Sequence, residues 1–291
     1  MIKSPATMIR LAGDLHPHVA PLYDESGLCF PLIRAVVDRL QRGWIWADDP
    51  EHPASALVVT AFGFTCLLGA QARSSPDRRP AADQGGSDSG FDSSVRRLLC
   101  AGGDDMPGYL LWYAPPPPFR AWLDARPATR FRRRERVRLR WNGAEPAYLG
   151  QIEAPADGLR LAPLDVGLIA EVDKLGLRLG SRFWSSVDDL LAHGFGACLV
   201  AHDGAVVSVC YASCVADGLA EIDIATRDDR RGRGYGGIVA REFVRQCRRR
   251  RMAPTWDCFT ANQASLRLAG SLGLVEASRY SLYSFQTPLP S

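Results

Sequence analysis

Alternating apolar and polar residues are clearest in the second half of the chain. The pattern there predicts three successive antiparallel strands, at residues 197–202, 205–214 and 219–226. Asp203-Gly204 and Asp217-Gly218 provide turn signals between these strands. A glycine-rich segment follows, and beyond it the apolar rhythm predicts a helix at 237–251, a strand at 255–258, a helix at 264–271 and a strand at 280–286.

Two further helices are predicted before these strands, at residues 166–177 and 187–193, the second of them capped by Ser185 or Ser186. The order is therefore helix, helix, three strands, glycine-rich loop, helix, strand, helix, strand. A Rossmann unit would instead place its glycine loop directly after its first parallel strand. The pattern indicates an α/β (α+β) fold with a mixed, mainly antiparallel sheet flanked by helices.

The first half of the chain predicts a smaller α/β unit. A helix at 31–42 is expected to end before Gly43, and strands are expected at 44–47, 56–64, 108–113 and 136–141. Residues 73–94 are rich in Ser, Asp, Gly and Pro, which favours a mobile loop. Residues 155–163 resemble a linker, so we expect domains at 1–155 and 164–291.

Composition excludes several classes of protein. The chain has 291 residues, of which 46% are hydrophobic and 23% charged, and its formal net charge is +3, which gives no general case for nucleic acid or membrane binding. The eight cysteines form no Cys-x-x-Cys pair and show no metal-ligand spacing, so we expect free thiols, no metal and a reducing cytoplasm. The first residues lack a signal-peptide pattern, and no apolar run reaches the roughly 20 residues of a membrane span.

The glycine-rich segment Arg231-Gly232-Arg233-Gly234-Tyr235-Gly236 joins a predicted strand to a predicted helix. Glycines allow a tight turn that directs successive N–H groups toward one concavity, and the helix N-terminus adds positive potential. These features suit a diphosphate, although a solvated hairpin is the alternative. The segment is not a Walker loop, because no Gly-Lys-Ser/Thr follows.

This segment resembles the acetyl-coenzyme A loop of the GNAT (Gcn5-related N-acetyltransferase) superfamily, which runs Arg/Gln-x-x-Gly-x-Gly/Ala after the fourth strand. Residues 262–274, from Asn262-Gln263-Ala264-Ser265 to Leu272-Gly273-Leu274, resemble the family's Asn-x-x-Ala/Ser…Leu-Gly-Phe segment. Residues 220–226 and 255–258 are similar to a bacterial subgroup that includes zwittermicin-resistance-type acetyltransferases. In that subgroup a degenerate GNAT-like half precedes the working domain.

The resemblance implies how acetyl-coenzyme A would bind. The backbone of Ile224, Ala225 and Thr226 would pair with the pantetheine arm, and Asn262 and Ser265 would reach the cofactor near its thioester end. The pyrophosphate would accept hydrogen bonds from the N–H groups of Arg231, Gly232, Arg233, Gly234, Tyr235, Gly236 and Gly237. The first half has no Arg-x-x-Gly-x-Gly loop, so we expect it to bind no coenzyme A.

Glu221 and Asp223 are two residues apart on a predicted strand, so they share one face, while Ile222 and Ile224 share the other. Acetyl transfer to an amine needs a neutral nucleophile and a route for its proton. We expect Glu221 to be the base, directly or through water, and Asp223 to anchor the substrate amine. The alternative is that both carboxylates simply face solvent.

Other candidates are less defined. Many GNAT members carry a tyrosine acid where this chain has Ala269, so Tyr280, Tyr283 or solvent would protonate the thiolate. Trp256 and Asp257 are candidate substrate contacts, with a core position as the alternative for Trp256.

Residues 130–140, RFRRRERVRLR, are strongly basic. Alternating arginines could follow phosphates, but no aromatic stacking residues interleave with them, so a solvated edge strand is the simpler interpretation. These arginines could also complement an acidic partner domain.

The sequence therefore predicts an N-acetyltransferase that acts on a primary amine of a small cationic molecule, by direct attack in a ternary complex. The alternatives are a non-catalytic acetyl-coenzyme A sensor or scaffold, and a protein or aminoacyl-RNA acetyltransferase. A small-molecule amine is the expected partner, nucleic acid and membranes are not expected, and a homodimer is compatible with the sequence.

Overall fold

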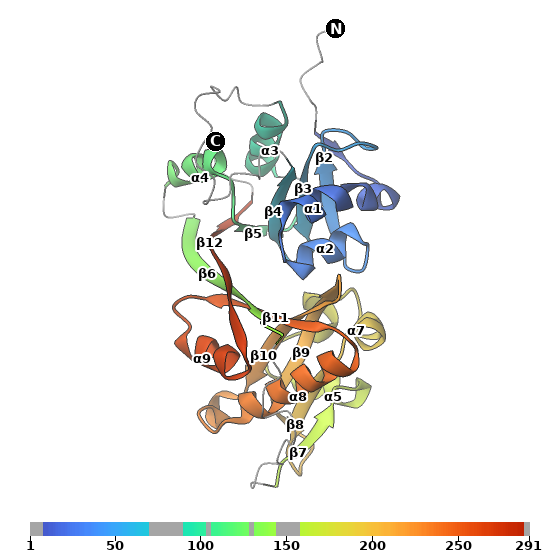
Figure 1. Ribbon diagram of the computed structural model, residues 1–291, viewed down its shortest axis with the longest axis vertical. Coiled ribbons are helices and arrows are strands. Elements are labelled where there is room, and N and C mark those ends of the chain that lie inside the picture. Colours follow the sequence, from blue (N-terminus) through green and yellow to red (C-terminus); the bar gives the residue numbers. More distant parts are fainter. Residues whose placement is uncertain (1–7, 70–89, 103–105, 128–130, 144–157, 288–291) are drawn as a thin grey trace. The chain divides into compact units, whose positions relative to one another are not determined.

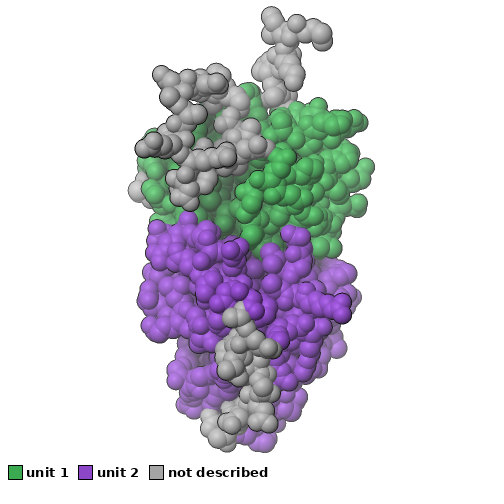
Figure 2. Space-filling view, in the orientation of Figure 1, with its two compact units in different colours: residues 1–134, 280–291 green, residues 135–279 purple. Residues whose placement is uncertain are grey.

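The computed structural model describes residues 8–69, 90–102, 106–127, 131–143 and 158–287. The chain divides into two compact units: unit 1 comprises residues 1–134 and 280–291, and unit 2 comprises residues 135–279 (Figure 2). Each unit is a mainly antiparallel sheet that carries helices on both faces (Figure 1). The predicted fold class is confirmed.

In unit 1 the strands lie in the order β1 (Ile9–Arg10), β2 (Gly43–Ala47), β3 (Ser55–Thr60), β4 (Phe64–Gly69), β5 (Tyr109–Tyr113) and the end of β12 (Leu274–Gln286). Neighbouring strands are antiparallel except for the parallel pair β4 and β5. The helices are η1 (Gly13–Val19), α1 (Ala20–Ser26), α2 (Pro31–Val37), α3 (Gly90–Ala101) and α4 (Pro117–Asp124).

Two apolar layers hold unit 1 together. On one face α3 and α4 bury Leu99 and Phe119 against Trp112 of β5. On the other face, helices α1 and α2 contact β3 and β4, and Phe30 stacks on Tyr113 and meets the ring of Phe64 edge to face. Burial of these aromatic side chains removes apolar surface from water and stabilises unit 1.

In unit 2 the strands lie in the order the end of β6 (Phe131–Trp141), β11 (Ala253–Phe259), β10 (Leu219–Thr226), β9 (Val206–Ala216), β8 (Gly196–Val200) and β7 (Arg160–Pro163). Among the described strand pairs of unit 2, β10 and β11 alone are parallel. The helices are α5 (Val166–Asp173), α6 (Leu179–Arg182), α7 (Val187–His193), η4 (Asp228–Arg230), α8 (Tyr235–Arg249) and α9 (Gln263–Ser271).

The helices of unit 2 also cover both sheet faces. Helix α8 buries Phe243, whose ring stacks on Phe195 at 4.9 Å, and the same core receives Ala269 of α9. The opposite face near β8 and β9 is covered by α5, α6 and α7, where the Trp184 indole N–H donates to the Ala212 carbonyl at 2.9 Å. Ser186 caps α7, as one of the two predicted alternatives.

Each half of the sequence gives its last strand to the other half. Strand β6 precedes the predicted linker, yet it pairs with β11 of unit 2, and β12 ends the chain, yet its residues 282–286 pair with β5 of unit 1. The compact units therefore differ from the expected domains at 1–155 and 164–291. The hydrophobic pattern identifies a strand but contains no information about its partner strand.

Several predicted boundaries need correction. The strand expected at 56–64 is two strands, β3 and β4, joined by a turn in which the Gly63 N–H donates to the Thr60 carbonyl at 2.9 Å. The helix expected at 31–42 ends at Val37, because Arg39 has a left-handed φ of 62°. The helix expected at 166–177 ends at Asp173.

Two predicted loops are partly regular structure. Helix α3 begins at Gly90, inside the loop expected at 73–94, whose residues 73–89 lie outside the described residues. The expected linker at 155–163 contains β7, which pairs with β8, while residues 155–157 lie outside the described residues. Backbone pairing with β8 orders residues that composition alone assigned to a linker.

All eight cysteines are free thiols, as predicted, and six of them are buried. Burial raises the pKa of the Cys66 and Cys198 thiols to about 12, so both stay protonated. Among the helices of the described ranges, none is long and apolar enough to cross a membrane.

Candidate active site

The two faces of β10 differ in chemistry. Ala220 and Ile222 enter the core beneath α8, whereas Glu221 and Asp223 project from the opposite side, as the alternation predicted. A bulge in the β9–β10 pairing lies at this point, since Glu221 pairs with Cys214 and Ile222 with Ala212. Bulges of this kind redirect side chains near functional sites. We call the side of the unit 2 sheet that carries Glu221 and Asp223 the polar face.

Glu221 is buried, with 5% of its side chain exposed. Its Oε2 atom accepts hydrogen bonds from Arg138 Nη1 at 2.9 Å and from the Thr255 hydroxyl at 2.7 Å. Within the described residues both side-chain hydrogen bonds go to Oε2, which leaves Oε1 to accept a proton or a water molecule. A buried carboxylate needs such partners to remain charged.

Arg138 connects Glu221 to a second carboxylate. Its Nη2 atom donates to Asp257 Oδ2 at 2.8 Å, and Arg136 contacts the other oxygen of Asp257 and donates from Nη2 to the Asp257 carbonyl at 2.9 Å. The side chains of Arg138 and Asp257 are 2% and 4% exposed. Two guanidinium groups and two carboxylates therefore form one buried network on the polar face.

This network corrects part of the interpretation of residues 130–140 as a solvated edge strand, since residues 132–135 and Arg140 are exposed but residues 137–139 are buried. Strand β6 is paired with β11, and Arg138 and Arg136 face carboxylates of unit 2 instead of solvent or phosphates. Sequence reasoning did not include Arg138 in the site. The signal that could have identified Arg138 is the period-two spacing of arginines 136, 138 and 140, which is the same spacing as that of Glu221 and Asp223.

Asp223 is the more accessible of the two predicted catalytic residues, with 26% of its side chain exposed. Its Oδ2 accepts a hydrogen bond from the Tyr211 hydroxyl at 2.8 Å and lies 3.6 Å from Arg182 Nη1. Burial, and then the neighbouring Asp223 charge, raise the pKa of the Tyr211 hydroxyl well above its ordinary value. Tyr211 therefore remains a hydrogen-bond donor to Asp223.

Strands β10 and β11 separate beyond the polar network. Their parallel pairing covers only Leu219 to Glu221 of β10, although β10 continues to Thr226. The backbone of Ile224, Ala225 and Thr226 thus pairs with β9 on one side and, within the described residues, with no strand on the other. This gap is the backbone feature that an extended pantetheine arm requires.

The loop after β10 presents unused donors. Gly232 and Gly234 have φ angles of 78° and 80°, and Gly234 is the N-cap of α8. In the part of the chain that the structure describes, the backbone N–H groups of Gly232, Arg233, Gly234 and Gly236 donate no hydrogen bond. Unpaired N–H groups at the start of a 15-residue helix fit a diphosphate.

The remaining predicted contacts have local roles. The Asn262 side-chain oxygen caps α9 by accepting from the Ser265 N–H at 3.1 Å, and the Ser265 hydroxyl accepts from the Trp256 indole at 2.8 Å. Trp256 is 3% exposed and packs beneath α8, on the other face from Asp257. Trp256 therefore takes the core position that was the alternative for it, because strand alternation directs it there.

The candidates for the general acid lie in the core of their units. Ala269 is fully buried, so the tyrosine position of the family is a packing position here. The Tyr283 hydroxyl donates to Asp124 at 2.8 Å, and burial together with this bond raises its pKa to about 12. Among the described residues, His, Cys, Asp and Glu form no group of three that could hold a metal ion.

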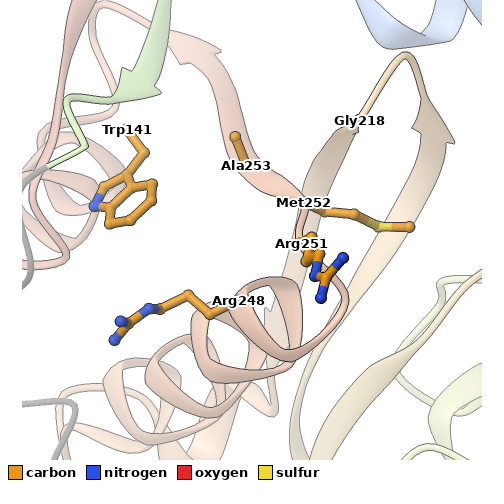
Figure 3. A pocket seen from close by; sticks show the side chains of 6 residues that line it. All are labelled: Trp141, Gly218, Arg248, Arg251, Met252 and Ala253. Atoms are coloured by element: carbon orange, nitrogen blue, oxygen red, sulfur yellow. The ribbon is translucent and has the colours of Figure 1, made fainter.

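A separate pocket lies at the C-terminal end of α8, opposite the glycine loop. Arg248, Arg251 and Met252 approach it from the helix end, with Trp141 on its other side (Figure 3). Its volume is about 360 Å³, and Gly218 and Ala253 complete the lining. None of the predicted site residues lines this pocket.

Comparisons with known proteins agree with this geometry. Residues 144–283 match a family model described as GNAT acetyltransferase. The chain is 25% identical over 264 residues to an uncharacterized N-acetyltransferase of Bacillus subtilis, YdfB, and this covers 90% of the chain and 92% of that relative. The matched region contains β10, the glycine loop and α8.

Solved structures show the same fold over both halves. A GCN5-related N-acetyltransferase-like protein from Streptococcus suis has a TM-score of 0.69 at 20% identity, covering 94% of this chain and 99% of that one. A tandem GNAT protein from the clavulanic acid biosynthesis pathway has a TM-score of 0.65 at 15% identity, covering 98% of this chain and 99% of that one. The two-half architecture is thus shared with a tandem protein, while the narrower subgroup similarity stays a prediction.

Proposed function

We propose that the chain is an acyltransferase of the GNAT superfamily that transfers the acetyl group of acetyl-coenzyme A to a primary amine. One observation carries the proposal: a single segment runs from the carboxylates of the polar face, through the gap beside β10, to the unpaired N–H groups of the loop. The segment thus contains a candidate proton acceptor, a backbone edge and an anion site in that order.

The donor would bind along this segment. N–H groups of the loop would hold the pyrophosphate, and the backbone of Ile224, Ala225 and Thr226 would pair with the pantetheine arm. Asn262 and Ser265 would lie near the thioester. When bound, acetyl-coenzyme A supplies the activated acetyl group.

The acceptor would be held by the polar face. Asp223 is partly exposed and would bind an ammonium group of a small cationic molecule, with Tyr211 holding its carboxylate in place. Glu221 would take the proton of the attacking amine at Oε1, directly or through water, while Oε2 stays bound to Arg138 and Thr255. The amine would attack directly, in a ternary complex, and the cytoplasm is the compartment we propose.

Glu221→Gln tests the assignment of the base. Glutamine keeps the shape of the side chain but cannot take a proton, so kcat should fall by about 10²- to 10⁴-fold while the Kd of acetyl-coenzyme A is unchanged. Activity would be followed as free coenzyme A thiol and by mass spectrometry of the amine, over diamines, amino sugars and amino acids. Glu171→Gln, which removes only an exposed ion pair with Lys174, is the matched control.

Asp223→Asn separates anchoring from proton transfer. It keeps an acceptor for the Tyr211 hydroxyl but removes the charge, so the KM of a cationic amine should rise about tenfold or more with a smaller change in kcat.

Two outcomes would contradict the proposal. If the Glu221→Gln enzyme kept the wild-type kcat, Glu221 would not be the base. Tight binding of acetyl-coenzyme A with no amine acetylated would favour the non-catalytic alternative.

A further inference from the structure

We propose that Arg138 is a positioning residue for acetyl transfer, which holds the Glu221 carboxylate in the orientation that directs Oε1 toward the acceptor. The inference rests on the proposed function, because it concerns the same site. It adds a residue that precedes the matched GNAT region at 144–283 and that the exchanged strand β6 supplies to unit 2.

The geometry requires a long side chain with two separated donors. Arg138 lies opposite Asp257 in the β6–β11 pairing, and Glu221 is on β10, on the far side of β11. The guanidinium therefore reaches across one strand, with Nη2 at 2.8 Å from Asp257 and Nη1 at 2.9 Å from Glu221. A planar guanidinium presents donors in a fixed fork, whereas the ammonium of lysine is a single point charge.

The bond to Glu221 is selective for one oxygen. Arg138 and the Thr255 hydroxyl both donate to Oε2, from β6 and β11 respectively, and they therefore fix the rotation of the carboxylate. Rotation that brought Oε1 to these donors would turn Oε2 away from them. The two donors thus determine which oxygen remains available to an amine or a water molecule.

Charge balance supports the same role. Glu221 and Asp257 are buried together, and without Arg138 the two carboxylates would have Arg136 as the remaining cation of this network. Arg138 pairs with both carboxylates and so offsets part of the cost of burying them together, which keeps Glu221 in this position.

The test compares full-length Arg138→Gln and Arg138→Lys with Arg140→Gln. Arg140 lies two residues along the same strand and is exposed, so its replacement controls for loss of positive charge on β6. We expect Arg138→Gln to lower kcat by about 10²-fold, with the KM of acetyl-coenzyme A nearly unchanged, because the glycine loop is not touched. Arg138→Lys should recover part of the loss.

A double variant distinguishes positioning from a purely structural role. If Arg138 acts through Glu221, adding Arg138→Gln to Glu221→Gln should change kcat by less than about threefold. The inference would be overturned if the two substitutions lowered kcat independently, so that their effects multiplied in the double variant. A wild-type kcat in Arg138→Gln would overturn it as well. An active Glu221→Gln enzyme would instead remove the proposed base, which is a different failure.

Crystal structures provide a readout that does not depend on the acceptor. In Arg138→Gln the Glu221 carboxylate should leave its wild-type orientation, whereas in Arg140→Gln it should keep it. An unchanged Glu221 in Arg138→Gln would contradict positioning even if no amine substrate were known. A displaced Glu221 would support positioning even if the chain proved to be a non-catalytic binder.

Discussion

At the scale of single residues, buried charge on the polar face is matched by opposite charge. Arg138 contacts Glu221 and Asp257, and Arg136 contacts Asp257. Removing one member of a buried pair costs about 3–5 kcal/mol, because the remaining charge stays uncompensated. Variants of this network should therefore also lose stability, which is why the enzymatic test is combined with a structural one.

His16 gives a prediction for the pH dependence of stability. Burial lowers the pKa of His16 below the ordinary 6.5, although its Nδ1–H donates a hydrogen bond to the Val36 carbonyl at 3.3 Å. The unfolded chain then binds the proton at a higher pH than the folded chain, so stability is full above about pH 6.5 and falls as the pH is lowered below it. Urea unfolding at about pH 7.5 and about pH 5.5 should show this loss.

In His16→Asn the stability should fall less between the two pH values than in the wild type, because the variant lacks the titrating group. His18→Asn is the control, since His18 is exposed and bonds the Pro50 carbonyl at 3.0 Å. An identical pH dependence for wild type and His16→Asn would show that other groups cause the loss.

At the scale of elements, the loop and α8 act together. The helix has no side-chain cap, and its N-cap residue is Gly234 in a left-handed conformation. A bound diphosphate would provide the acceptors that a capping side chain normally supplies. The residues following Gly232 thus leave the helix end open for an anion.

Gly234→Ala tests this arrangement. A Cβ at Gly234 meets no atom within 4 Å, so the cost is conformational, about 1–2 kcal/mol for a left-handed alanine. The loop should relax to another conformation and its N–H groups should point elsewhere, so the Kd of acetyl-coenzyme A should rise by about tenfold or more. Isothermal titration calorimetry of the variant and the wild type measures this change in Kd.

Gly204→Ala is the matched control. Gly204 has a similar φ of 85° and equal free space, but it lies in the turn between β8 and β9. The Gly204→Ala substitution should lower the free energy of unfolding by a similar amount and leave the Kd of acetyl-coenzyme A unchanged. Equal losses of affinity in the two variants would mean that the effect comes from stability and not from the anion site.

At the scale of the whole molecule, the two units repeat one plan but differ in their loops. In each unit three antiparallel strands are followed by a helix and a strand parallel to the third, namely β5 in unit 1 and β11 in unit 2. Only the second half contains an Arg-x-x-Gly-x-Gly sequence. The fold is therefore repeated, whereas the glycine loop is not.

We predict that one chain binds a single acetyl-coenzyme A. Calorimetric titration of the full-length protein should give a stoichiometry near one, and Gly234→Ala should weaken that site. Two sites per chain, or binding that Gly234→Ala does not affect, would mean that the first half holds the cofactor.

The sequence by itself determined most of the second half. Strand β10 has the predicted bounds, and the bounds of α7, α8 and α9 differ from the prediction by no more than two residues at either end. Their signals are local: alternation on β10, the Ser186 cap of α7 and the glycines before α8. The opposite faces of Glu221 and Ile222 also follow from a period of two, so the candidate carboxylates were accessible from sequence alone.

Only the tertiary structure decided which elements meet. Nothing local indicates that β6 pairs with β11, that β12 pairs with β5, or that Arg138 lies 2.9 Å from Glu221 across 83 residues of sequence. Pairing partners depend on the burial of whole faces, and this is a property of the assembled sheet. The sequence thus located the glycine loop and the two carboxylates of β10, whereas the network that surrounds Glu221 arises only when the last strand of the first half enters the second.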